Sequence, residues 1–286
     1  MATVLAIDVG GTKMAAARVD ARGRLTARVQ VATPSGDGVG SEELWSALAD
    51  LVKPVVAAGD LVACGVGCGG PMSPGGELVS PLNIAAWRDF PLRARLATLT
   101  GLPVFVDNDA KALALGEGWI GAAAGVQNFI AMVVSTGVGG GIVLDGRLLD
   151  GASGNAGHIG HVVVEPDGRA CACGGRGCLE AEASGLSIAA VTGQPPAFAS
   201  GEVKERTGRL VGRAVASVAN LLDLELAVVA GSVALGFGSA FFEAAQTELS
   251  ARARLSFSRS ARIVPAGLGD AGPLVGAARV AFRQLP

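Results

Sequence analysis

Two carboxylates and an amide stand together at Asp107, Asn108 and Asp109, and these groups can bind a hydroxylated ligand and remove a proton from it. The apolar run from Val104 to Val106 precedes them, and an Ala/Leu-rich run with helical spacing follows, which predicts a strand that turns into a helix. In open α/β sheets ligands bind beyond the carboxyl ends of strands, so one aspartate is expected to face a ligand. The alternative is that both acids only cap the helix and complement its first turn.

Phosphate binding is indicated by an internal repeat. The segment Ile130–Gly146 repeats the opening pattern of the chain, an apolar strand, a small polar residue, a glycine-rich turn and a second apolar strand. A shift of 127 residues sets Asp8 on Ser135 and Gly10 on Gly137. Glycines in such turns let backbone N–H groups approach phosphate oxygens. One glycine hairpin alone is also what a tight β-turn needs, but a duplicated pair favours two similarly built domains facing one cleft.

The cysteines predict a metal site. Cys171, Cys173 and Cys178 offer three soft ligands in a glycine-rich loop, and a cytoplasmic protein is not expected to use them for disulfides. Zinc prefers four ligands, and a histidine upstream would complete a closed structural site. The chain has two histidines, His158 and His161. By contrast, Cys64 and Cys68 lie in or beside an apolar strand and are interpreted as core residues.

Length and composition set limits on the protein class. The 286 residues, half of them hydrophobic, can form one large domain or two of medium size. The net charge of −2 gives no reason to expect nucleic acid as a partner. No basic segment precedes the first apolar run, which Asp8 interrupts, so we expect no signal peptide. The longest uncharged stretch, Leu226–Phe242, contains three glycines, so we expect no membrane span and a cytoplasmic location.

Hydrophobic patterns place the remaining elements. Besides the two hairpins and the strand before Asp107, we expect these segments: a turn at 20–23 into a strand at 24–31, a helix at 41–58, a strand at 61–67, a Gly/Pro-rich loop at 68–76, a short helix at 91–99, a loop at 192–201, a helix at 206–222, a strand at 227–230, a turn at 231–236 into another helix, and a final helix at 272–282.

Several motifs in this order resemble the ROK group (repressors, open reading frames, kinases) of the sugar-kinase/actin-like superfamily, over nearly the whole chain. The carriers are Ile7–Lys13 (IDVGGTK), Gly69–Pro71 (GGP), Asp107–Ala110 (DNDA), Ser135–Gly141 (STGVGGG), Gly157–His161 (GHIGH) and Cys171–Glu180 (CACGGRGCLE). The resemblance implies two actin-like (ribonuclease H-like) α/β domains with the duplicated hairpins. It places residues 1–108 with 272–286 in a small domain and 109–271 in a large domain with the zinc loop.

The resemblance also implies transfer of the γ-phosphoryl group of ATP to the 6-hydroxyl of a hexose or N-acylhexosamine. Asp109 is then the general base, and Asp107 is the helix cap. Asn108 hydrogen-bonds sugar hydroxyls, and Asp8 holds Mg²⁺ through water. The sugar contacts implied are Gly70, Asn108, Asp109, His158, His161 and Glu180. The phosphate and nucleotide contacts implied are Gly10, Gly11, Thr12, Thr136, Gly137, Gly139 and Gly231, with Asp8. Lys13 is either a phosphate contact or a solvated turn lysine.

The metal site implied by the resemblance is a structural Zn²⁺ held by His161, Cys171, Cys173 and Cys178. The second ring nitrogen of His161 would point toward a sugar hydroxyl and so couple metal to substrate. Four protein ligands leave no open position for water, which disfavours a zinc hydrolase.

His158 departs from the commonest pattern of the group, whose hexose-specific members have a sugar-binding Glu at this position. The form Gly-His-Ile-Gly-His, with Cys-x-Cys-Gly-x-x-Gly-Cys, resembles bacterial N-acetylmannosamine kinases. We therefore expect N-acetylmannosamine as the favoured acceptor. The alternative for His158 is a loop histidine with a structural role.

Two other functions stay open: a glucokinase of the same group, and a sugar-sensing regulator without catalysis. Repressors of the group carry a DNA-binding helix-turn-helix before the first glycine motif, and only three residues precede Val4 here. We therefore expect sugar and ATP as ligands, no nucleic acid partner and a homodimer. Polyphosphate could replace ATP as the donor.

Overall fold

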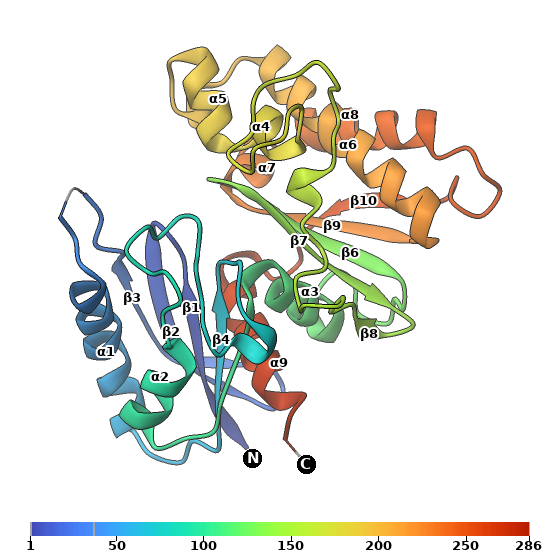
Figure 1. Ribbon diagram of the computed structural model, residues 1–286. Coiled ribbons are helices and arrows are strands. Elements are labelled where there is room, and N and C mark those ends of the chain that lie inside the picture. Colours follow the sequence, from blue (N-terminus) through green and yellow to red (C-terminus); the bar gives the residue numbers. More distant parts are fainter. Residues whose placement is uncertain (1, 37, 286) are drawn as a thin grey trace. The chain divides into compact units, whose positions relative to one another are not determined.

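The structure is a computed structural model that describes residues 2–36 and 38–285. The chain forms two compact units, each built on its own five-stranded sheet with helices packed against it (Figure 1). The first unit comprises Met1–Ile120, Asp150–Ala156 and Leu268–Pro286, and the second comprises Gly121–Leu149 and Gly157–Gly267. Each unit has a mixed sheet, helices packed against it and an equivalent glycine hairpin, which confirms the predicted α/β fold class.

The first sheet has the strand order β3-β2-β1-β4-β5. Its strands are β1 (Thr3–Val9), β2 (Lys13–Asp20), β3 (Leu25–Ala32), β4 (Cys64–Cys68) and β5 (Val104–Asn108). β1, β2 and β3 are antiparallel, and β4 and β5 run parallel to β1. The predicted turn at 20–23 is confirmed, because the Asp20 carboxylate accepts the N–H groups of Arg22 and Arg24. The predicted strand at 61–67 is confirmed with a later start, at Cys64.

Helices cover both faces of the first sheet. α1 (Ser41–Ala57) and α2 (Leu92–Thr100) contribute to one apolar core, and α9 (Gly272–Phe282) contributes to another. α3 (Asp109–Ile120) packs on α9. The backbone of α9 lies so close to β4 that a side chain at Gly65 would collide with the Ala277 carbonyl. Glycine in β4 therefore lets the C-terminal helix complete the unit, and the predicted final helix is confirmed.

The second sheet repeats the first, with the order β10-β9-β6-β7-β8. Its strands are β6 (Phe129–Val134), β7 (Val138–Leu144), β8 (Arg147–Leu148), β9 (Leu226–Ala230) and β10 (Arg262–Pro265). β6, β7 and β8 are antiparallel, and β9 lies parallel to β6 and β10. Strand for strand, β6 to β10 correspond to β1 to β5.

The helices of the second unit are α4 (Leu179–Ala183), α5 (Gly185–Thr192), α6 (Gly201–Leu222), α7 (Ser232–Phe237) and α8 (Ser239–Arg252). α6 starts at Gly201 and not at 206 as predicted, because the Ser200 side chain caps it by accepting the N–H of Val203. α6 and α8 approach closely, since side chains at Gly208 and Gly212 would collide with the carbonyls of Phe241 and Ala245.

Four short 3-10 turns complete the described elements: η1 (Pro74–Gly76), η2 (Ile159–His161), η3 (Pro196–Phe198) and η4 (Gly269–Ala271). Within residues 2–36 and 38–285, every helix is too short or too polar to span a lipid bilayer.

Candidate functional site

Parallel pairing brings three of the predicted segments to one edge of the first sheet. Val9 pairs with Cys68, and Cys68 pairs with Asn108, so β1, β4 and β5 end side by side. The glycine turn follows β1, the loop containing Gly70 follows β4, and Asp109 follows β5. We call this the first carboxyl edge. It is the location at which open α/β sheets bind ligands.

At the end of β5, the helix cap is Asn108. Its side-chain oxygen accepts the N–H groups of Ala110 at 3.0 Å and Lys111 at 3.3 Å. The prediction that Asp107 caps the helix is therefore wrong. The physical reason is Lys111, whose ammonium lies 3.2 Å from the Asp107 carboxylate. Because the Asn108 oxygen is used in the cap, the part of its amide that can serve a ligand is the NH₂ group, which only donates.

Asp109 is the first residue of α3, and its carboxylate accepts the N–H of Ala110 at 2.8 Å. A second carboxylate, Asp8, stands near the end of β1, and the charge of Asp109 contributes to raising its pKa. Gly67 separates the two, because a Cβ at that position would lie 3.6 Å from the Asp109 Cα and 3.8 Å from an Asp8 oxygen.

The electrostatics of this pair fit a bound cation. Burial and the neighbouring Asp109 raise the pKa of Asp8 to about 7, and the charge of Lys13 offsets only part of that. Two carboxylates in one place disfavour ionisation of both unless a positive charge joins them. A divalent cation with oxygen ligands is the group that such a pair favours.

The first glycine turn is held from two sides. The Thr33 hydroxyl donates to the Gly10 carbonyl at 2.7 Å, and the Thr33 N–H donates to the Thr12 carbonyl at 3.0 Å. On the other side, a side chain at Gly11 would lie 2.7 Å from the Asn83 Cβ. The turn is therefore fixed, and Thr12 and Lys13 at its exposed end can present groups to a ligand.

The second sheet has an equivalent edge at the ends of β6 and β9, which we call the second carboxyl edge. Thr136 is exposed and Gly137 half-buried in the turn after β6, and the Ser135 hydroxyl lies 2.9 Å from that of Ser232. Gly231 follows β9 with a φ of 101°, and a side chain there would collide with the Val134 carbonyl. Gly139 lies within β7 and is paired with Val133.

Glu180 connects the second carboxyl edge with residues 169–178, which carry the three clustered cysteines and which we call the cysteine loop. It stands in the first turn of α4, two residues after Cys178, and its Oε2 accepts the N–H of Val138 at 2.8 Å. The other carboxylate oxygen, Oε1, can accept a hydrogen bond from a ligand.

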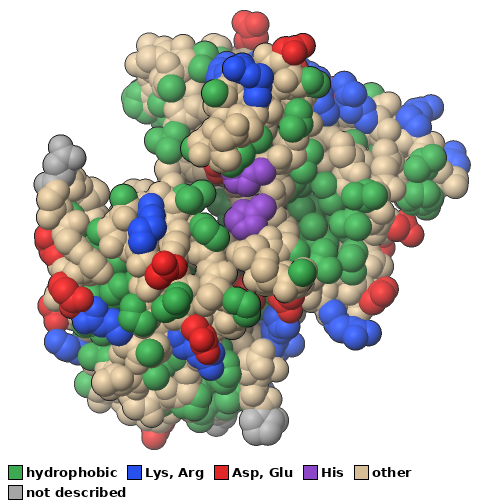
Figure 2. Space-filling model, in the orientation of Figure 1, with side chains coloured by type: hydrophobic (Ala, Val, Ile, Leu, Met, Phe, Trp, Pro, Cys, Tyr) green, Lys and Arg blue, Asp and Glu red, His purple; other side chains and the backbone are tan. Residues whose placement is uncertain are grey.

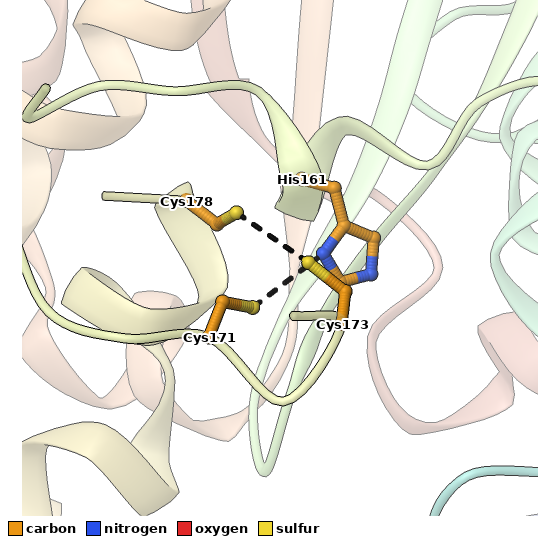
Figure 3. A group of neighbouring side chains, drawn as sticks. All are labelled: His161, Cys171, Cys173 and Cys178. Atoms are coloured by element: carbon orange, nitrogen blue, oxygen red, sulfur yellow. Dashed lines mark hydrogen bonds between the residues drawn. The ribbon is translucent and has the colours of Figure 1, made fainter. Parts of the chain in front are cut away.

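The four predicted zinc ligands form one cluster in the second unit (Figure 3). Their ligand atoms all lie within 4.8 Å of one another. The Cys171 sulfur lies 3.7 Å from His161 Nδ1, and the sulfurs of Cys173 and Cys178 are 3.8 Å apart. A tetrahedral zinc with Zn–S bonds of about 2.3 Å requires ligand atoms at about this separation. The donor set therefore fits Zn²⁺ bound to Nδ1, with Nε2 directed away from the sulfurs.

The thiols of this cluster have unequal environments. Burial raises the pKa of Cys178 to about 12, whereas the backbone N–H of Gly175 lowers the pKa of Cys173. Zinc binds thiolates, so loading the cluster must release protons.

A buried carboxylate holds the cysteine loop independently of any metal. Glu182 accepts the Arg169 N–H at 2.6 Å and pairs with the side chains of Arg169 and Arg206 at 3.0 and 2.7 Å. Burial alone would raise the pKa of Glu182, but these partners outweigh it and the pKa is lowered. The loop is thus anchored to α6 by ionic hydrogen bonds.

His158 is exposed and lies beside His161, with ring centroids 6.0 Å apart. Figure 2 shows the histidine side chains of the chain together at the surface. The preceding Gly157 has a φ of 104°, and a side chain there would collide with the Gly140 carbonyl. The segment therefore lies directly against β7, and this contact fixes where His158 emerges.

Sequence reasoning missed three residues that shape the first carboxyl edge: Thr33, Asn83 and Lys111. The spacing of Asp107 and Lys111, four residues apart at a helix start, is a signal that could have been used. Thr33 and Asn83 carry no local signal, because their contacts join segments far apart in the sequence.

Comparison with known proteins places these features in a family. Residues 4–284 match the ROK family. An N-acetylmannosamine kinase of Citrobacter koseri is 40% identical over 252 residues, which cover 82% of this chain and 85% of the relative. The crystal structure of a ROK family glucokinase from Streptomyces griseus, in complex with glucose and AMPPNP, is 30% identical and superposes with a TM-score of 0.86, covering 98% of this chain and 99% of that one. A ROK hexokinase from Thermus thermophilus is 34% identical, with a TM-score of 0.81 and coverage of 99% and 98%.

Proposed function

We propose that this chain, which belongs to the ROK family and is an ATP-dependent sugar kinase, phosphorylates the 6-hydroxyl of an N-acylhexosamine and prefers N-acetylmannosamine. The observation that carries the choice of acceptor is the exposed His158 beside His161. The name of the relative from Citrobacter koseri supports the same choice.

Asp109 is the base of the proposed reaction. The sugar oxygen attacks the γ-phosphorus, the bond from that phosphorus to the bridging oxygen breaks, ADP leaves, and the hydroxyl proton passes to the Asp109 carboxylate. Phosphoryl transfer has a loose transition state, so the protein mainly positions the reactants and neutralises charge. A carboxylate at the start of a helix is adequate for that role, because the helix N-terminus favours its ionised form.

Both glycine turns supply phosphate contacts in this proposal. Gly10, Gly11 and Thr12 would do so at the first edge, and Thr136, Gly137, Gly139 and Gly231 at the second. Asp8 would hold Mg²⁺ through water. When bound, Mg²⁺ neutralises charge on the phosphate oxygens. The raised pKa of Asp8 supports this role, because a cation would replace the proton that the buried carboxylate otherwise retains. Lys13 lies near enough to lower that pKa, which favours a role at the phosphates over a purely solvated one.

The acceptor would be held by Gly70, Asn108, His158, His161 and Glu180. The orientation of Asn108 supports donation of hydrogen bonds to sugar oxygens, since its own oxygen caps α3. A structural Zn²⁺ would orient His161 through Nδ1, so that Nε2 could contact a hydroxyl.

The proposal also includes a homodimer, which analytical ultracentrifugation would test by measuring the mass of the assembly in solution.

The role of His158 follows from its hydrogen-bonding capacity. A Glu carboxylate only accepts hydrogen bonds, whereas a neutral imidazole has one donor and one acceptor. A donor suits the carbonyl oxygen of an N-acyl group on the second carbon of the sugar. Because a site built to hydrogen-bond a group rejects analogues that lack it, unmodified hexoses should be poorer acceptors.

The proposal is tested by kcat/KM for N-acetylmannosamine, N-acetylglucosamine, glucose and mannose with ATP. His158→Glu should shift the ratio toward unmodified hexoses by roughly one to two powers of ten, the scale of one well-placed polar contact. His158→Gln, which keeps a donor and an acceptor, is the matched control and should retain the preference.

Glucose is the second candidate acceptor, because the structurally similar protein from Streptomyces griseus is a glucokinase. Wild-type protein that prefers glucose would establish this alternative. Sugar binding without turnover on any acceptor would instead favour a sugar-sensing regulator.

A further inference from the structure

One loop of the first unit comes from the middle of the chain. The chain leaves the second unit after β8, contributes Asp150–Ala156 to the first unit, and returns before η2. We call this segment the 150–156 loop. It folds back on itself, since the Ala156 N–H donates to the Asp150 carbonyl at 3.0 Å.

The 150–156 loop supplies two of the three acceptors that hold the ammonium group of Lys111. The Lys111 side chain is only 3% exposed, and its Nζ lies 2.6 Å from Asp150 Oδ1, 3.0 Å from the Gly154 carbonyl and 3.2 Å from Asp107 Oδ1. An ammonium has three N–H donors, so these acceptors use all of them. Because a buried charge without partners is costly, the loop and the helix start hold each other in one arrangement.

The same loop binds the segment that contains Gly70. The Asn155 side chain makes two hydrogen bonds with the backbone of Met72: it accepts the Met72 N–H at 3.5 Å and donates to the Met72 carbonyl at 3.3 Å. Met72 is two residues beyond Gly70, in the loop that follows β4.

Two side chains thus join three segments that are far apart in the sequence: residues 70–72, 107–111 and 150–156. Asn108 and Asp109 stand between Asp107 and Lys111, inside the helical turn that the ion pair closes. We infer that Lys111 and Asn155 are positioning residues, which set the segment at Gly70 relative to the donor of Asn108 and the carboxylate of Asp109. The inference rests on the proposed sugar kinase function and adds a determinant of acceptor geometry to it.

Misplacement by about 1 Å can cost a reaction as much as 10²-fold, so loosening either contact should be visible in the kinetics. The nucleotide contacts in the glycine turns do not involve Lys111 or Asn155. Loss of the loop contacts should therefore raise the KM for the acceptor and lower kcat, and leave the KM for ATP nearly unchanged.

The test uses Asn155→Ala and Asp150→Ala, because the Asp150 side chain is 59% exposed and its removal leaves Lys111 with two acceptors. Lys111→Met is the stronger variant, to be measured together with its thermal unfolding. Lys53→Met is the matched control, since Lys53 pairs with Asp50 on the surface, where the two side chains are 61% and 72% exposed.

For Asn155→Ala and Asp150→Ala we expect the acceptor KM to rise roughly three- to tenfold and kcat to fall by a similar factor, while the KM for ATP changes less than about twofold. Amide hydrogen exchange at Gly70 and Met72 should become faster in both variants. Lys53→Met should match wild type in all of these measurements.

Equal changes in both KM values, or unchanged acceptor KM and exchange rates, would overturn the inference. If wild-type protein phosphorylated none of the sugars, the proposed function would fail instead. The exchange rates at Gly70 and Met72 would then still decide whether the 150–156 loop holds this segment.

Discussion

The two carboxyl edges share one topology and differ in charge. β1 to β5 and β6 to β10 are connected and ordered in the same way, and Asp8 corresponds in sequence to Ser135. The first edge carries two neighbouring carboxylates, Asp8 and Asp109. The second carries hydroxyls and glycines around Ser135, Ser232 and Gly231, and its Glu180 carboxylate accepts the Val138 N–H. The shared topology therefore accounts for a glycine turn at each edge, and the side chains beside these turns account for the difference in chemistry. We propose that the first edge receives the hydroxyl proton and holds the metal. The second edge would contact the nucleotide through uncharged groups.

The largest effect should come from Asp109→Asn, which removes the carboxylate that we propose as the base but keeps the size of the side chain and a hydrogen-bonding group. We expect kcat to fall by roughly 10²- to 10⁴-fold with sugar affinity nearly unchanged. A coupled ADP assay and calorimetry measure the two quantities. A variant that kept more than about a tenth of kcat, a loss below 1.4 kcal/mol, would remove Asp109 from the role of base.

Cys173→Ser tests whether the zinc cluster of the second unit contributes to sugar affinity. Wild type should contain one zinc per chain, and the variant should lose it together with roughly 10- to 100-fold in sugar affinity, because His161 loses its orientation. Metal analysis and calorimetry provide the readouts, with Cys64→Ala as a control outside the cluster. Unchanged sugar affinity in a zinc-free variant would restrict the metal to stabilising the loop.

Asn108→Asp separates capping from binding at the first edge. Aspartate is as good a helix cap as asparagine, so the cap is kept, and any fall in the thermal midpoint measures repulsion of the added charge by Asp107 and Asp109. The NH₂ donors are lost and a negative charge is added, so sugar affinity should fall roughly tenfold. Asn108→Ala should lose the same affinity and in addition about 1 kcal/mol of stability. Unaltered sugar binding in Asn108→Asp would mean that this amide has no part in recognition.

Asp8→Asn tests the carboxylate pair of the first edge through the pH dependence of stability. A carboxyl group whose pKa is about 7 in the folded state and 3.8 unfolded binds its proton more tightly when folded. Its contribution to the free energy of unfolding is therefore present below about pH 4 and lost as the pH rises to 7. Without metal, the variant should be more stable than wild type at pH 8 by about 4 kcal/mol, because each unit of pKa difference corresponds to about 1.4 kcal/mol, and it should be no more stable at pH 4. Denaturant unfolding at both pH values checks this.

The sequence was sufficient for features that depend on local pattern. The two hairpins and the strand-to-helix junction at Asp109 follow from runs of apolar residues interrupted by glycine or capping residues. The zinc ligands follow from the resemblance together with the cysteine spacing, and the structure brings them within reach of one ion.

Features that depend on contacts between distant segments could not be predicted from the sequence. Which of Asp107 and Asn108 caps α3 depends on the buried amine of Lys111, and Lys111 is buried because Asp150 and Gly154 reach it from another segment. The short helices α4 and α5 were not predicted, since each is set by contacts with the cysteine loop and the second carboxyl edge.

The contrast between the edges is tested most directly by nucleotide affinity as a function of Mg²⁺, measured by calorimetry for wild type and Asp8→Asn at pH 8. We predict that Mg²⁺ strengthens ATP binding to wild type and has much less effect on the variant. Metal-free ATP should bind the variant at least as well as wild type, because a repelling carboxylate has been removed. A variant that retained the full Mg²⁺ dependence would contradict the assignment of the metal to the first carboxyl edge.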